Sequence, residues 1–230
     1  MKNIAFVSLG QENSKYGRML VDSIKKTNSS FRIIQISKID DDKIKNIDEK
    51  LTSNFNAKSL MLNRLESQIK VVKKYGATIF LDADMIVTKD LSKVFDLLKE
   101  YDLILTKRKN DFLLKDKILN IKFPDLTNKT ANDFVRHVNP WLIKESFLNI
   151  RFPEFTNKNA NESMPFNGGF IASSSVVFLE KILEIYLKLP KRFRYWYGDQ
   201  VALKKIFDKE KSKIKILETT YNYNVESLSD

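Results

Sequence analysis

Short apolar runs alternate with helix-like spacing along the first third of the chain. Residues 4–8 and 31–36 are runs of β-branched and aromatic side chains, which favour β-strands. The positions with helical spacing between these two runs are Tyr16, Met19, Leu20, Ser23 and Ile24. The pattern predicts a strand, a helix and a second strand, which together form a βαβ unit.

The same alternation continues beyond this unit. A helix is predicted over residues 60–75, ending at Gly76, and it leads into the apolar strand 77–81. The apolar positions expected on one face of this helix are Leu62, Leu65, Ile69 and Val72, and those of the following helix are Leu91, Val94, Phe95 and Leu98. A strand over 103–105 follows. Apolar strands that alternate with helices indicate an α/β fold with a mostly parallel, Rossmann-like sheet flanked by helices.

The last third of the chain resumes this pattern after an unusual middle segment. We predict an apolar helix that begins near Val176 and stops before Pro190, a second helix from Gly198 to about Phe207, and a strand over 214–217. The chain of 230 residues is expected to form a single domain.

The middle segment contains a tandem duplication. Residues 118–133 return as residues 147–162 with conservative exchanges, beginning Ile-Leu-Asn-Ile-Lys-Phe-Pro in the first copy and Phe-Leu-Asn-Ile-Arg-Phe-Pro in the second. Two copies are too few for a solenoid, which needs about three repeats. We interpret residues 109–163, approximately, as an insert that either lines an acceptor cleft or covers one edge of the sheet.

Composition places the chain among proteins that fold in water. Hydrophobic residues make up 43% and charged residues 30% of the sequence. No apolar run approaches the roughly 20 residues that span a bilayer, and the first residues do not resemble a signal peptide. We therefore expect a cytoplasmic protein without a transmembrane segment, and peripheral membrane contact stays open.

The charged and metal-binding side chains narrow the range of partners. The net charge of +11 favours anionic partners, yet the Lys residues are scattered and form no basic run with interleaved aromatic residues, so we expect no specific nucleic-acid partner. Cysteine is absent and the only histidine is His137. A metal would therefore be held by oxygen ligands, with His137 as the single nitrogen candidate.

Asp82 and Asp84 follow the apolar strand 77–81. The carboxyl ends of parallel strands are where α/β sheets bind ligands, and residues i and i+2 of an extended chain point the same way. Two carboxylates on one side suit a hard cation such as Mn²⁺ or Mg²⁺, which also binds phosphate oxygens. The alternative is that Asp82 and Asp84 only end the strand.

Four segments resemble those of family 8 of the GT-A-fold glycosyltransferases, the glycogenin-like and bacterial galactosyltransferase-like enzymes. Residues 80–87 read Phe-Leu-Asp-Ala-Asp-Met-Ile-Val, residues 166–171 read Phe-Asn-Gly-Gly-Phe-Ile, residues 197–203 read Tyr-Gly-Asp-Gln-Val-Ala-Leu, and residues 221–223 read Tyr-Asn-Tyr. They occur in the same order as the family's Asp-x-Asp block, Asn-x-Gly segment, Asp-Gln helix start and closing strand. The likeness covers residues 1–108 and 164–224, approximately.

The resemblance implies a function and a set of site residues. It implies metal-dependent transfer of a hexosyl group, with retained configuration, from a UDP-linked sugar to a hydroxyl of a glycan, a lipid-linked acceptor or a protein. The metal ligands it implies are Asp82 and Asp84. The implied catalytic positions are Asn167, Asp199 and Gln200, and the implied donor-binding positions are Ser8, Arg64, Asp82, Ala83, Asp84, Asn167, Gly168 and Gly169.

Several alternatives remain beside this hypothesis. The family supplies a third metal ligand from a His after the Tyr-Asn strand, and this chain has none there, so a catalytically inactive sugar-nucleotide binder stays open. A sugar-phosphate nucleotidyltransferase would need a Gly-rich loop after the first strand, and Gly10 and Gly17 are too far apart to form it. Asn167, Gly168 and Gly169 are also typical of a hairpin turn, and Asp199 of a helix N-terminus.

Overall fold

The computed structural model describes residues 1–56, 59–107, 165–190, 194 and 198–218. Residue contacts divide the chain into two compact units, residues 1–107 with 166–230, and residues 108–165. All helices and strands named below belong to the first unit. The insert with its duplication, His137 and the segment 221–223 lie outside the described residues, so these predictions stay predictions.

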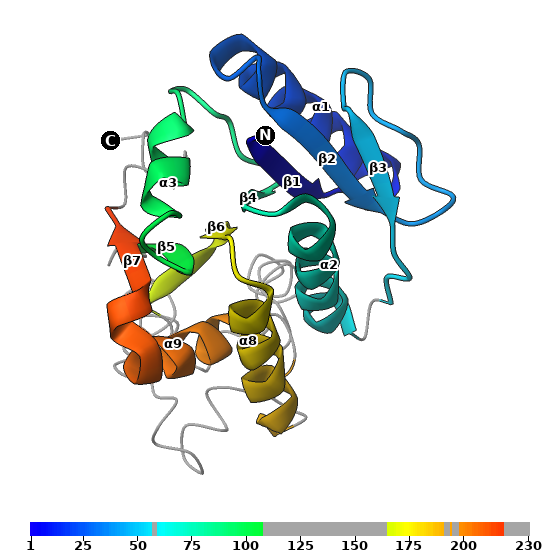
Figure 1. Cartoon of the computed structure of the whole chain (residues 1–230). Helices are drawn as coiled ribbons and strands as arrows, with labels where there is room; N and C mark the ends of the chain where they lie inside the picture. The colour runs from blue at the N-terminus through cyan, green and yellow to red at the C-terminus, as the bar shows by residue number, and fades with distance from the viewer. Residues whose placement is uncertain (57–58, 108–164, 191–193, 195–197, 219–230) are drawn as a thin grey trace, which may run out of the picture. The chain divides into compact units, whose positions relative to one another are not determined.

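A seven-stranded sheet forms the centre of the first unit (Figure 1). Its strands are β1 (Asn3–Val7), β2 (Arg32–Ser37), β3 (Glu49–Thr52), β4 (Thr78–Asp82), β5 (Leu103–Lys107), β6 (Phe166–Ser173) and β7 (Ile214–Leu217). They lie in the order β3-β2-β1-β4-β6-β5-β7, and every neighbouring pair is parallel except the two that involve β6. The predicted α/β class with a mostly parallel sheet is confirmed.

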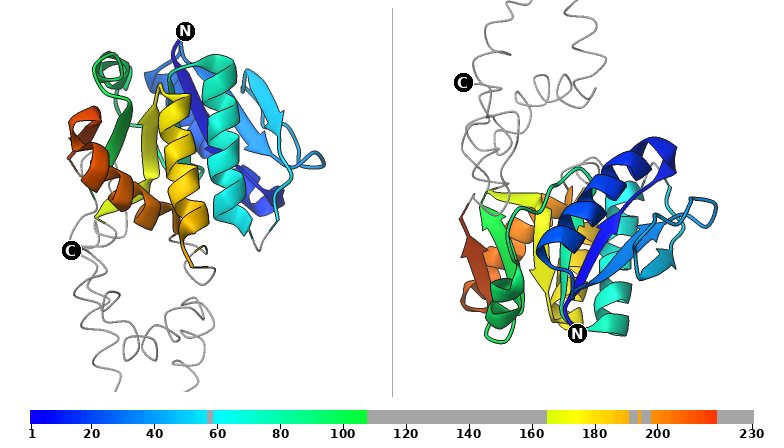
Figure 2. Two further views of the ribbon diagram at one scale, coloured as in Figure 1. Left: turned by 60° about the horizontal axis from the view of Figure 1, so that its bottom comes forward. Right: turned by 90° about the horizontal axis from the view of Figure 1, so that it is seen from above.

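Helices cover both faces of the sheet, as Figure 2 shows. The helices are α1 (Gly10–Thr27), α2 (Leu60–Tyr75), α3 (Ser92–Leu97), α8 (Val176–Lys188) and α9 (Gly198–Glu210), followed by the short 3₁₀ helix η5 (Lys211–Lys213). α1 and α3 lie on one face, and α2, α8 and α9 on the other. Since side chains alternate along a strand, each face receives its own set of apolar residues.

The α1 face holds an apolar core. Ile4 and Phe6 of β1 belong to this core, and the edge of the Phe31 ring meets Phe95 with centroids 5.4 Å apart. Ala5 and Val7 alternate with these core residues along β1 and line a pocket, to which Phe6 also contributes. β1 thus takes part both in the apolar core and in the pocket lining.

Some local predictions need correction. The strand β3 was not predicted, because only one of its four residues is hydrophobic and it pairs with the sheet along one edge alone. On α1, Leu20 and Ile24 are fully buried as their spacing indicates, whereas Tyr16 and Met19 are each 50% exposed. The buried stripe of α1 passes through Gly17 instead, where a Cβ atom would lie 2.6 Å from Ile44 Cδ1.

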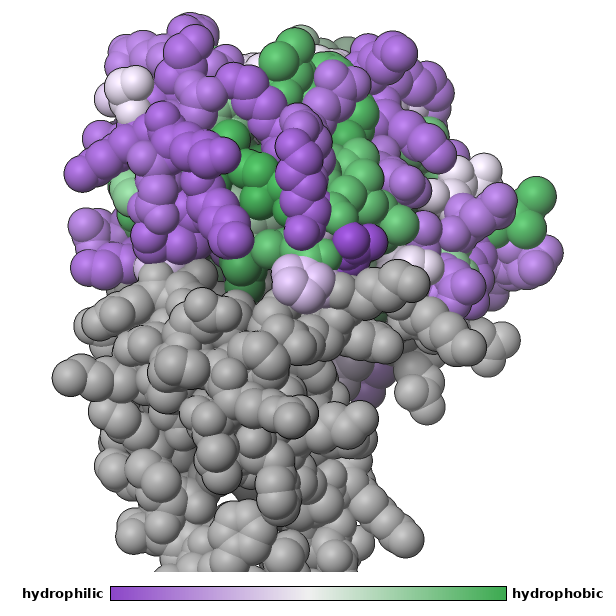
Figure 3. Space-filling view, turned by 90° about the horizontal axis from the view of Figure 1, so that it is seen from below, coloured by the Kyte–Doolittle hydropathy of each residue, from purple (hydrophilic) through white to green (hydrophobic). Residues whose placement is uncertain are grey.

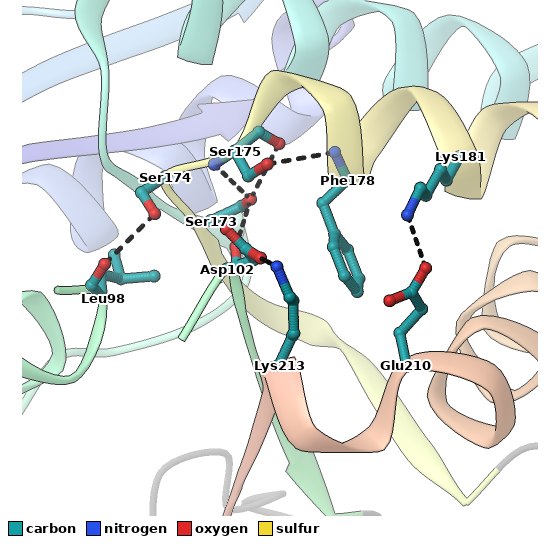
Figure 4. Close-up of polar contacts among 9 residues, drawn as sticks. All are labelled: Leu98, Asp102, Ser173, Ser174, Ser175, Phe178, Lys181, Glu210 and Lys213. Atoms are coloured by element: carbon teal, nitrogen blue, oxygen red, sulfur yellow. Dashed lines mark hydrogen bonds and ion pairs between the residues drawn. The ribbon is translucent and has the colours of Figure 1, made fainter. Parts of the chain in front are cut away.

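Three consecutive serines fix the carboxyl end of β6 to its neighbours (Figure 4). Ser173 Oγ donates to Asp102 O at 2.8 Å, and Ser174 Oγ donates to Leu98 O at 3.2 Å. Ser175 Oγ accepts from Phe178 N at 3.2 Å and caps α8, a contact that typically stabilises by about 1 kcal/mol. The other end of β6 carries residues 167–169.

The antiparallel direction of β6 decides where that other end lies. Leu81 of β4 pairs with Phe170 of β6, so the residues before Phe170 extend beyond the carboxyl end of β4. The sequence segments around Asp82 and Asn167 therefore reach the same edge of the sheet, although 85 positions (167 minus 82) separate them. This edge is where α/β sheets bind ligands.

The face shown in Figure 3 is hydrophilic on its flanks, with a band of apolar surface between them. Among the described residues, no helix combines the length and the apolar character needed to cross a membrane.

Candidate active site

A pocket of about 500 Å³ opens at the carboxyl edge of the sheet, on the α2 face. Its volume lies within the range of about 300–1,000 Å³ that small-molecule sites occupy. β1, β4, β6, α2 and α9 all contribute to its lining. Nine of the ten predicted site residues line it, namely Arg64, Asp82, Ala83, Asp84, Asn167, Gly168, Gly169, Asp199 and Gln200.

Asp82 is the last residue of β4, and Asp84 follows in a turn closed by a hydrogen bond from Met85 N to Asp82 O at 3.2 Å. Partial burial of the carboxyl raises the pKa of Asp84, and the nearby negative charge of Asp82 adds to the effect. A divalent cation would offset the negative charge of both carboxylates, so the pair is a suitable donor set for one.

No group of three or more His, Cys, Asp or Glu side chains is arranged to hold a metal among the described residues. Among the described residues, the metal ligands would thus be Asp82 and Asp84 alone. Mg²⁺ is commonly held by one or two carboxylates together with substrate phosphates and water, so the pair fits that mode of binding.

Arg64 of α2 connects three elements around the pocket. Its Nη2 lies 2.9 Å from Asp82 Oδ1 and donates to Gly168 O at 2.6 Å, and its Nη1 lies 4.0 Å from Asp199 Oδ2. Its side chain is only 14% exposed. Burial acts to lower the pKa of the guanidinium, but the charges of Asp82 and Asp199 outweigh it and leave the pKa raised. Arg64 therefore stays charged and ties β4, β6 and α9 together.

The Asn-Gly-Gly segment lies inside strand β6, so the alternative reading as a hairpin turn is wrong. Asn167 Oδ1 accepts from Gly169 N at 3.0 Å. A Cβ atom on Gly168 would lie 3.5 Å from Asp199 Oδ2 and 3.6 Å from Gln200 Nε2. Both distances are ordinary van der Waals contacts, so Gly168 lies directly against the first turn of α9.

Asp199 and Gln200 lie in the first turn of α9, as their sequence context predicts. Asp199 is 2% exposed, and its Oδ1 accepts from Gln200 N at 2.9 Å. Burial raises the pKa of the Asp199 carboxyl, while Arg64 and the hydrogen bond from Gln200 act in the opposite direction. A buried carboxylate that lies beside an arginine and lines a pocket is suited to accept hydrogen bonds from ligand hydroxyls.

The structure does not bring Ser8 into the pocket. Ser8 is buried, and its Oγ lies 3.4 Å from the place of a Cβ on Gly17 of α1, on the opposite face of the sheet. Conversely, the pocket is lined by residues that the sequence did not point out: Leu9, Tyr16, Ile36, Met61 and Gln68. The four-residue spacing from Arg64 to Gln68 on one helix is the signal that the sequence contained.

No family model matches the sequence, and no curated protein is similar to it at the sequence level. Solved structures do share its fold. The glycosyltransferase GlyE of Streptococcus pneumoniae TIGR4 superimposes with a TM-score of 0.55 at 15% identity, over 96% of this chain and 46% of GlyE. The chain thus spans just under half the length of GlyE.

Two further structures agree. The galactosyltransferase LgtC, solved in complex with donor and acceptor sugar analogs, gives a TM-score of 0.53 at 12% identity over 94% of this chain and 73% of LgtC. A glycosyltransferase involved in glycosylation of the major capsid of PBCV-1 gives 0.51 at 9% identity, over 95% of this chain and 82% of that one. The chain has the fold of GT-A-like glycosyltransferases.

Proposed function

We propose that this chain is a glycosyltransferase that moves a hexosyl group from a UDP-linked sugar to a hydroxyl acceptor. One observation carries the proposal: Asp82 and Asp84 share a pocket with Asn167, Arg64 and Asp199 at the carboxyl edge of a GT-A-like sheet. The donor and acceptor sugar analogs in LgtC support a nucleotide-sugar donor and a sugar acceptor. Lipid-linked and protein hydroxyls are further acceptor classes.

We assign three groups of lining residues to the three parts of such a donor. Leu9, Tyr16 and Ile36 offer apolar and aromatic surface for the base. Asp82 and Asp84 carry the negative charge that would hold a metal ion, which would offset the charge of a diphosphate. The third region, formed by β6 and the start of α9, presents amide and carboxylate groups that suit sugar hydroxyls.

Asp82 and Asp84 would hold the Mn²⁺ or Mg²⁺. The bound ion would neutralise charge on the diphosphate leaving group as the bond to the sugar breaks. Arg64 keeps Asp82 oriented and adds a fixed positive charge beside the pocket. Asn167, Asp199 and Gln200 bind and orient the sugar. We infer retention of configuration from the resemblance to family 8 and name no nucleophile.

The structure bears on one of the two alternatives to this function. β1 ends at Val7 and α1 begins at Gly10, so only two residues connect them, which is too short for a loop that cradles a triphosphate. This feature disfavours a nucleotidyltransferase. An inactive sugar-nucleotide binder would use the same pocket, and only a measurement of turnover separates it from an enzyme.

Calorimetric titration with UDP and with UDP-hexoses, with and without Mn²⁺, tests the proposed donor and metal, and release of UDP from a UDP-hexose tests turnover. We expect tighter binding with Mn²⁺, and we expect Asp84→Asn to weaken the Mn²⁺-dependent binding at least about tenfold, because one of two charged metal ligands is lost. Asp82→Asn should do the same, although it also removes the partner of Arg64.

The matched control is Asp96→Asn. Asp96 lies on the surface of α3 and pairs only with the exposed Lys99 among the interactions of the described residues. The Asp96→Asn variant should bind UDP and UDP-hexoses with the affinity of the native chain. Sugar-nucleotide affinity that is the same in the native chain, Asp82→Asn and Asp84→Asn, or absent throughout, would refute the proposed function.

A further inference from the structure

The inner part of the pocket contains a buried amide oxygen without a partner. The pocket extends inward along β1 to Ala5, along β4 to Phe80, and along α2 to Gln68. Gln68 is 2% exposed, and its Oε1 is buried and accepts no hydrogen bond from any of the described residues. A buried carbonyl oxygen left in this state destabilises the folded protein, so its presence calls for a physical reason.

Gln35 of β2 shows that the fold can satisfy a buried glutamine. It is 1% exposed, its Oε1 accepts from Ile44 N at 2.9 Å, and its Nε2 donates to Asp42 O at 3.0 Å. Gln68 is equally buried but faces the pocket. Unpaired polar groups that persist in pockets are commonly those that a ligand satisfies.

The chemistry of the amide limits which ligand group meets it. An amide oxygen needs a hydrogen-bond donor, and ionised phosphate oxygens are acceptors only, so the diphosphate does not satisfy it. A hydroxyl group does, because it donates to Oε1 and also accepts from the amide nitrogen.

The position of Gln68 on α2 indicates which hydroxyl group this is. Gln68 follows Arg64 by four residues, so the two side chains lie on one face of the helix. Arg64 contacts Gly168 O and lies 4.0 Å from Asp199, on the elements to which the proposed function assigns the sugar, and 2.9 Å from Asp82 at the proposed metal. The neighbouring amide is therefore nearer to the diphosphate and the sugar than to the base, and because the diphosphate offers no donor, the sugar is its partner.

We propose that Gln68 is a specificity-determining residue whose side-chain amide hydrogen-bonds a hydroxyl group of the transferred sugar. The proposal rests on the proposed function, in which this pocket binds a nucleoside-diphosphate sugar. It adds a contact from α2 to those from β6 and α9, so that three elements surround the sugar. The unpaired oxygen lowers the stability of the free protein, and in return the amide is available to select the sugar.

The test replaces Gln68 with Met, which keeps the length and the unbranched shape of the side chain but removes the amide. Titration with UDP and with UDP-glucose or UDP-galactose, whichever the native chain binds more tightly, is carried out in Mn²⁺. We expect Gln68→Met to weaken the UDP-hexose about tenfold and to leave UDP within about twofold, because UDP has no sugar to bond. The free variant should melt about 2–4 °C higher, since an unpaired buried oxygen is gone.

Gln35→Met is the matched control. It removes two formed hydrogen bonds, so it should melt lower than the native chain while leaving the ratio of UDP to UDP-hexose affinity unchanged. Opposite shifts of the melting temperature in the two variants would support a ligand-directed role for Gln68 and a structural role for Gln35.

Three outcomes would overturn the assignment of Gln68. If Gln68→Met bound the UDP-hexose as tightly as the native chain does, the assignment of Gln68 would be wrong, while the proposed function would stand. Equal weakening of UDP and UDP-hexose, or a lower melting temperature of the free variant, would show that the amide serves the nucleotide or the fold. If the native chain bound no sugar nucleotide, the proposed function would be wrong, and so would the assignment of Gln68.

Discussion

We expect Arg64→Met to lower the free energy of unfolding by about 3 kcal/mol, because it removes the partner of a buried carboxylate. The guanidinium lies 2.9 Å from Asp82 and 4.0 Å from Asp199, whose side chain is 3% exposed, and it also satisfies Gly168 O. At about 2–4 °C per kcal/mol, the melting temperature should fall by about 6–12 °C. Thermal or urea unfolding measures the change.

Arg64→Lys and Arg18→Met complete this experiment. A Lys keeps the charge but cannot present two donor nitrogens in a fixed plane, so Arg64→Lys should recover only part of the lost stability. Arg18 is exposed on α1, and its replacement should change stability by no more than about 0.5 kcal/mol. Equal stability of Arg64→Met and Arg18→Met would contradict the role of Arg64 as the link between β4, β6 and α9.

The second large effect is expected for Asp199→Asn. The Asn side chain has the same shape and still accepts the hydrogen bond from Gln200 N, so the start of α9 should be preserved. It lacks the charge, and hydrogen bonds to a charged acceptor are worth about 1.5–3 kcal/mol, so kcat/KM with a UDP-hexose should fall about 10- to 100-fold. Steady-state release of UDP measures it.

Asp208→Asn is the control on the same helix. Asp208 is exposed on α9 and pairs with Lys204, a surface contact of small energetic value. The kcat/KM of the Asp208→Asn variant should match that of the native chain. If Asp199→Asn turned over UDP-hexose at the native rate, the buried carboxylate would have no part in sugar binding.

Most of the fold could be predicted from the spacing of apolar residues. Leu91, Val94, Phe95 and Leu98 are all buried, and the helix that begins at Gly198 starts where its sequence indicates. The strand β3 escaped because Glu49, Lys50 and Thr52 do not look like a buried strand, and its pairing to β2 comes from the sheet rather than from its own composition.

The site residues were predictable only where a short segment of the sequence contains the functional side chains together. Two aspartates after an apolar strand indicate their position at the sheet edge, and the pocket contains both. The direction of β6 could not be read from Asn167 and its neighbours, because strand pairing depends on residues far apart in the chain. Gln68 was missed since a glutamine on a helix is usually a surface residue, and its burial results from the packing of α2.

The most direct test of the central claim is a crystal structure of the full chain grown with Mn²⁺ and a UDP-hexose, with anomalous diffraction recorded at the manganese edge. The proposal predicts an anomalous peak within bonding distance of the carboxylates of Asp82 and Asp84 and of the diphosphate, with the sugar against Asn167 and Asp199. A nucleotide bound away from this pocket, or manganese located away from both aspartates, would contradict it.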